Sequence, residues 1–148
     1  MDAVNMDLIR KRLSEIRDAA RLLEKYLQKP FRELDLSEIL SVRYLIIQLV
    51  ESSTAICMHV LITVYREYPE GYPSCFILMS RKGLISNELG EKLAAAARLR
   101  NLLIHRYWEI DDRKVYNEAK KGLRDFIEFA DLIERWLKDG DKVSLSRS

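Results

Sequence analysis

The chain has 148 residues, a length that suits one domain able to bury roughly 70% of the surface its unfolded form exposes. Its 25 lysines and arginines stand against 23 aspartates and glutamates, so the formal charge of +2 indicates no broad nucleic-acid surface, although a local basic site stays open. Cys57 and Cys75 have no CxxC spacing and lie in apolar segments, which predicts reduced, buried thiols in a cytosolic protein. A zinc site would have to combine them with His59 and His105 from scattered positions, and we expect no metal site and no cofactor.

The N-terminal segment carries acids and bases but lacks the apolar stretch of a secretory signal, so we expect cytoplasmic localisation. Residues 45–65 form an apolar segment that is long enough to cross a membrane. This segment contains Gln48, Glu51 and His59, which are rare inside membrane spans. The sequence therefore favours a buried core helix and no membrane association.

The spacing of apolar residues predicts helices along the chain. The first helix has apolar residues three or four positions apart and ends at Lys29-Pro30. A second helix is expected from about Glu38 to Arg66, before the proline- and glycine-containing residues 67–74 break the chain. A short third helix is expected from about Ser74 to Lys82, and it stops at Gly83 because glycine tolerates the left-handed conformation after a helix.

Two longer helices follow. Ser86 is the expected N-cap of a fourth helix, which runs from about Asn87 to Tyr107. Asp111 or Asp112 is expected to cap a fifth helix that ends before Gly140, and residues 141–148 are predicted to form a flexible tail. Because strand patterns, internal repeats and glycine-rich phosphate loops are absent from the sequence, it predicts an all-α fold. We expect one domain over residues 1–140, an up-and-down bundle of about five helices.

The segment RLRNLLIHRYWEI, residues 98–110, places Arg100, Asn101 and His105 in an otherwise apolar helix. Buried charge is costly unless it is paired or used, so these side chains need partners or a function. Asn101 and His105 are i,i+4 neighbours, and the arginine reaches the same zone from one turn back. We expect the trio to face a space beside the small residues Ala94 and Ala97 rather than the core.

Other residues of these helices are assigned by the same helical projection. Tyr107 follows Arg100 by seven residues, so it points in nearly the same direction around the helix axis if the fourth helix continues that far. Glu51 is the one carboxylate in the apolar part of the second helix, and an arginine that keeps its charge is its natural partner, so we hypothesise that Glu51 approaches Arg100. The core seam of the fourth helix is expected to consist of apolar residues on another arc: Ala95, Ala96, Leu99, Leu102 and Leu103.

These residues resemble a known family. RNLLIH, residues 100–105, fits the Arg-x4-6-His motif of HEPN domains, including the polar residue that usually follows the arginine. RNLLIHRY fits the longer Arg-x4-His-x-Tyr form of the HepT-like toxins, which are partners of minimal nucleotidyltransferase antitoxins. The resemblance extends to YPSCFILMSRKGLISNELGEKL, residues 72–93, and to the order of the helices, so it covers most of the chain and implies a HEPN-like bundle.

The resemblance implies a metal-independent endoribonuclease that acts as a homodimer. RNA cleavage by its own 2′-hydroxyl needs a base, an acid and positive charge on the reacting phosphate. His105 can serve as base or acid near neutral pH, Arg100 can bind phosphate bidentately, and the Asn101 amide can position either. One motif histidine per chain supplies only one proton-transfer role, so a dimer that joins two motif helices supplies both.

In the resembling family, the antitoxin attaches AMP to the tyrosine that matches Tyr107, which implies inhibition of this chain by AMPylation of Tyr107. The alternative function is a non-catalytic helical module that helps a nucleotidyltransferase hold nucleotide or substrate, and it would also use Arg100 and His105 to contact phosphate. From spacing alone, the favoured interpretation is that His105 is a satisfied core histidine and Arg100 a structural ion-pair partner, and it is the family resemblance that favours the functional one.

Several further polar residues receive structural predictions. For His59 and Glu51 a structural role at an interface is favoured. Arg98 and Arg106 flank the motif and could hold RNA phosphates, but most arginines on helices are simply solvated. No base-reading element is recognisable, so the sequence does not define the RNA target.

Overall fold

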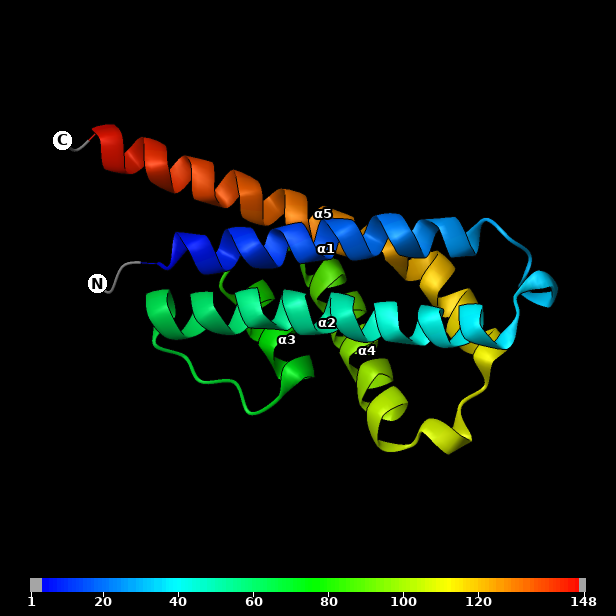
Figure 1. Cartoon of the computed structure of the whole chain (residues 1–148). Coiled ribbons are helices and arrows are strands. Elements are labelled where there is room, and N and C mark those ends of the chain that lie inside the picture. The colour runs from blue at the N-terminus through cyan, green and yellow to red at the C-terminus, as the bar shows by residue number, and fades with distance from the viewer. Residues whose placement is uncertain (1–3, 147–148) are drawn as a thin grey trace.

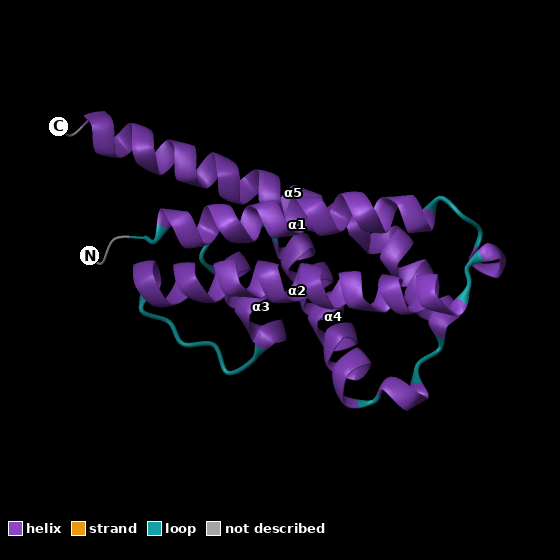
Figure 2. Ribbon diagram, in the orientation of Figure 1, coloured by secondary structure: helices purple, strands orange, loops and turns teal. Residues whose placement is uncertain are grey.

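The computed structural model describes residues 4–146 of the chain, and side chains over residues 4–140. Within this part the chain contains helices and connecting loops but no strand, which confirms the predicted all-α fold (Figure 2). The elements in chain order are α1 (Met6–Leu27), η1 (Phe31–Glu33), α2 (Leu36–Tyr65), α3 (Tyr72–Arg81), α4 (Asn87–His105), η2 (Tyr107–Glu109) and α5 (Asp112–Ser146), where η marks a short 3₁₀ helix.

The long helices α1 and α2 pack side by side and run in opposite directions (Figure 1). Helix α5 returns along α1, so both ends of the described chain lie at one end of the bundle. The shorter helices α3 and α4 pack against each other and cross α2 steeply, passing behind it in the view of Figure 1. The motif lies in the C-terminal part of α4, and this crossing brings Arg100 of that part to Glu51 in the middle of α2.

Polar side chains fix where several helices begin. Asp35 and Glu38 form a capping box, with the Asp35 carboxylate accepting the Glu38 N–H at 2.8 Å, so α2 starts two residues earlier than predicted. Ser86 is the N-cap of α4, as the sequence predicts. Of the two aspartates proposed for α5, it is Asp111 that accepts backbone N–H groups of the first turn. Gly83 has φ of +79°, which confirms the left-handed stop after α3.

One apolar core joins the five helices. Its largest fully buried side chains include Phe76 of α3 and Phe129 of α5, whose rings meet edge to face with centroids 6.0 Å apart. Helix α2 is long and apolar enough to span a membrane, yet 61% of its most apolar window is buried inside the structure, as predicted for a core helix. Cys57 and Cys75 are free and buried, and burial raises the pKa of the Cys57 thiol well above its usual value.

The end of α5 differs from the prediction. The helix continues past Gly140 to Ser146, because a glycine without a left-handed backbone need not stop a helix. Side chains of residues 141–146, and residues 147–148 entirely, lie outside the described part of the chain. The flexibility assigned to residues 141–148 therefore stays a prediction.

Candidate functional site

Arg100 forms the centre of the site. Its guanidinium is largely enclosed, with 16% of the side chain exposed, and its Nε and Nη2 groups both donate to Oε1 of Glu51 on α2, Nε at 2.7 Å. Its Nη1 group donates to Oδ1 of Asn101 at 2.9 Å. The hypothesised approach of Glu51 to Arg100 is therefore confirmed, and helix α2 supplies the carboxylate that compensates the arginine charge.

Tyr72, which the sequence analysis did not select, completes this group. It lies in the first turn of α3, and its phenol donates to Oε2 of Glu51 at 2.8 Å. Its ring lies under the Arg100 guanidinium, with Cζ 4.4 Å from the ring centroid. Burial and the neighbouring carboxylate raise the pKa of Tyr72, so the phenol stays a protonated donor. The only sequence signal was its place at the start of the segment that shares the family resemblance.

His105 is the last residue of α4, one turn beyond Asn101. Its imidazole is exposed, and no described residue hydrogen-bonds to it. The Asn101 amide oxygen accepts from Arg100, and no hydrogen bond joins Asn101 to His105 among the described residues. The motif thus divides into an enclosed, held arginine and an exposed histidine that is free to meet a substrate or a second chain.

The expected arcs of α4 are partly wrong. Ala94 and Ala97 are fully buried and form core instead of lining an open space, whereas Leu102 of the predicted seam is 47% exposed and Ala95 is exposed. Leu103 is buried as predicted. The physical reason is that α4 packs through the arc that contains Arg100, against α2 and α3, because Glu51 and Tyr72 satisfy the arginine there.

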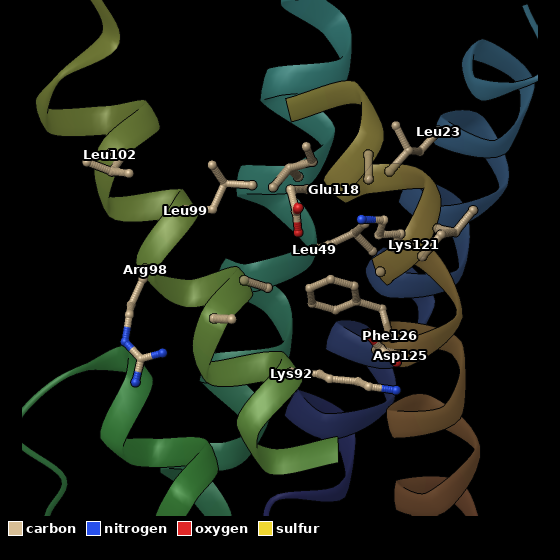
Figure 3. Close-up of a pocket in the computed structure, with 16 residues that line it drawn as sticks. Leu23, Leu49, Lys92, Arg98, Leu99, Leu102, Glu118, Lys121, Asp125 and Phe126 are labelled. Carbon is tan, nitrogen blue, oxygen red and sulfur yellow. The ribbon is translucent and has the colours of Figure 1, made fainter. Parts of the chain in front are cut away.

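The remaining seam residues line an open groove between α4 and α5. The groove has a volume of about 650 Å³, and Leu99 from α4 and Phe126 from α5 point into it (Figure 3). Lys92 and Asp125 lie at its edge, and burial raises the pKa of the Asp125 carboxyl. Arg98 also lines the groove, but it is exposed, and its side chain extends away from Phe126 in this view.

Tyr107 does not lie on the helix that carries Arg100. Helix α4 ends at His105, Arg106 has φ of −136°, and Tyr107 opens η2, so the predicted angular match with Arg100 is wrong. Its phenol side chain is 62% exposed and packs edge to face on Trp108, with centroids 5.2 Å apart. The backbone is held by Arg43, which donates to the Tyr107 carbonyl at 3.3 Å.

Other candidate residues have local partners. Nε2 of His59 accepts the backbone N–H of Asn5 at 2.9 Å, so His59 anchors the start of α1. Arg106 pairs with Glu109 at 3.5 Å on the surface. Over residues 4–140, no group of three or more histidine, cysteine, aspartate or glutamate side chains is arranged to hold a metal ion.

Comparison with solved structures shows the same fold. The tri-AMPylated HEPN toxin of Shewanella oneidensis in complex with its MNT antitoxin has 22% identity and a TM-score of 0.80, covering 87% of this chain and 98% of that one. A toxin-antitoxin complex with AMP-PNP has 22% identity and a TM-score of 0.79, with the same coverages. YutE, a cytosolic protein of unknown function from Bacillus subtilis, has 16% identity and a TM-score of 0.84 over 95% of both chains.

Sequence comparison gives the family. A search of curated proteins gives no match to this chain. The family model described as ribonuclease HepT-like matches residues 14–133, which is most of the chain and includes the motif of Arg100 and His105. The chain therefore belongs to the ribonuclease HepT-like family.

Proposed function

We propose that this protein is the toxin of a toxin-antitoxin system and acts in the cytoplasm as a metal-independent endoribonuclease. The observation that carries the proposal is that the C-terminal part of α4 presents two motif residues: an enclosed Arg100 that is held by Glu51, and an exposed His105. The family match supports the ribonuclease activity. The solved HEPN toxin bound to its MNT antitoxin supports a nucleotidyltransferase as the partner.

Arg100 has capacity left for a phosphate. Three of its five N–H groups donate to Glu51 and Asn101, which leaves one N–H on each Nη nitrogen without an acceptor among the described residues. Two such donors on one planar group match two oxygens of a phosphate diester. Arg100 therefore keeps the geometry to stabilise charge that develops on the reacting phosphate.

His105 supplies proton transfer in this proposal. An imidazole titrates near neutral pH and can take the proton of the attacking 2′-hydroxyl or protonate the leaving 5′-oxygen. Since one chain carries one motif histidine, we propose that the active site is composite and lies at a homodimer interface. The outer arc of α4, with exposed Leu102 beside His105, is the surface that a second chain would cover.

Tyr107 is the proposed site of AMPylation by the partner. Its exposed phenol follows the motif by two residues, and the hydrogen bond from Arg43 to the Tyr107 carbonyl holds this loop at the helix end. Added AMP would bring negative charge and bulk next to His105 and compete with RNA phosphate. Co-expression with the partner nucleotidyltransferase, followed by mass spectrometry, should find AMP on Tyr107. Full inhibition with an unmodified Tyr107 would show that the partner acts by occlusion instead.

Growth measurements test the toxin proposal in cells. Expression of the chain should arrest growth, and His105→Ala should remove the arrest while the protein stays folded, because His105 is exposed. Arg100→Lys should also be inactive, since lysine lacks the planar fork. Arrest that persists in both variants would contradict the assigned roles. A wild-type chain that neither arrests growth nor cleaves RNA would favour the non-catalytic binding module.

A further inference from the structure

We propose that Tyr72 is a positioning residue that orients Arg100 toward a phosphate diester through two simultaneous contacts, one with Glu51 and one with the guanidinium face. This inference rests on the proposed ribonuclease function. It assigns the site a third helix, α3, in addition to the motif helix α4 and the helix α2 that carries Glu51.

The start of α3 holds Tyr72 firmly. Gly71, the N-cap, donates its N–H to the Ser74 hydroxyl at 3.1 Å, and that hydroxyl donates back to the Gly71 carbonyl at 2.9 Å. Pro73 lies in the first turn, where its fixed φ favours the helix. Tyr72 therefore projects from a fixed backbone, and its contacts with Glu51 and Arg100 are part of a rigid arrangement.

Tyr72 and Arg100 bind different oxygens of the Glu51 carboxylate. Oε2 accepts from Tyr72, whereas Oε1 alone accepts from Arg100. Without the phenol, the carboxylate could rotate so that each of its oxygens accepts one N–H in a bidentate pair, and the plane of the guanidinium would change with it. Tyr72 thus fixes the orientation of the Glu51 carboxylate and, through it, the direction of the Nη donors that remain for phosphate.

The ring has a second effect. At 4.4 Å from the Arg100 Cζ, it covers one face of the guanidinium and restricts its rotation. Together with Asn101 at the Nη1 side, the ring fixes the plane in which the free N–H groups point. A guanidinium that is already oriented loses less conformational entropy when it binds a phosphate.

Chemical rescue provides the direct test. In Arg100→Ala, the space bounded by Glu51 and Tyr72 should bind free guanidinium ion, and millimolar guanidinium chloride should restore part of the RNA cleavage. Adding Tyr72→Leu should weaken this rescue by about tenfold, and adding Tyr72→Phe should weaken it less, because the ring stays. Tyr68→Leu is the matched control, since Tyr68 is 69% exposed in the loop before α3, and it should leave the rescue unchanged.

A second readout does not depend on activity. The Arg100 Nε–H signal in ¹H–¹⁵N NMR, assigned by its loss in Arg100→Ala, should shift and exchange faster with water in Tyr72→Leu and less so in Tyr72→Phe. If the wild-type chain cleaves no RNA, the proposed function fails while this NMR result still decides whether Tyr72 holds Arg100. An unchanged Arg100 signal, or a rescue that is independent of Tyr72, would overturn the positioning role.

Discussion

The ion pair between Glu51 and Arg100 makes a quantitative prediction for stability. Glu51→Gln keeps the side-chain size but removes the charge that accepts from Nε and Nη2 of Arg100. A hydrogen bond between charged groups contributes about 1.5–3 kcal/mol, and breaking a fully buried pair costs about 3–5 kcal/mol. Because Glu51 is 37% exposed, we expect the lower range, about 2 kcal/mol less free energy of unfolding.

Urea denaturation followed by circular dichroism measures this loss. With an m-value of about 1–3 kcal/mol/M, the midpoint should fall by about 1 M. The control is Glu67→Gln, because Glu67 is similarly exposed at 41% but its partner Lys82, 3.0 Å away, is 31% exposed where Arg100 is 16% exposed, so a loss below about 1 kcal/mol is expected. Equal losses in the two variants, at equal protein concentration, would refute the argument that enclosure makes the Arg100 pair special.

Three further predictions concern the rest of the molecule. Leu102→Glu should convert the proposed dimer to monomers in sedimentation at micromolar concentration, whereas Leu22→Glu, at a similarly exposed residue of α1, should leave it dimeric. If both variants remain dimeric, the proposed interface is wrong. Asp125→Asn should raise the melting temperature at pH 7, because burial raises the Asp125 pKa and disfavours its charged form. The gain in melting temperature should vanish near pH 3, where this carboxyl is protonated in both the folded and the unfolded chain. A gain that is independent of pH would contradict the burial of a charged Asp125 as its cause. Gly90→Ala should destabilise the fold by about 1–2 kcal/mol in urea denaturation, because its Cβ would lie 2.9 Å from the Ser80 Cβ, and an unchanged midpoint would contradict the close packing of α3 and α4.

The helices and their starts could be predicted because they depend on local chemistry. The Ser86 cap and the Gly83 stop are visible within a few residues of sequence, and the apolar spacing defines each helix. The link between Glu51 and Arg100 could also be inferred, since the one carboxylate in the apolar part of α2 and an arginine within the apolar part of α4 each need a partner.

The features of the site that could not be predicted from the sequence depend on contacts between helices and on where α4 ends. The helical projection gives relative angles in α4 but not which arc meets α2 and α3, so it predicts a core position for Leu102, which is exposed in the structure. A helix that continued to Tyr107 would carry it beside Arg100, whereas the chain leaves α4 after His105. Tyr72 could not be found from spacing because it contacts the motif from another helix, α3.

RNA cleavage in the presence of EDTA tests the central claim most directly. Purified wild-type chain should cut a labelled RNA and leave 2′,3′-cyclic phosphate ends, because the attacking group is the RNA's own 2′-hydroxyl. His105→Ala should remain folded and lose this cleavage. Cleavage that persists in His105→Ala, or that requires an added divalent metal, would contradict the account.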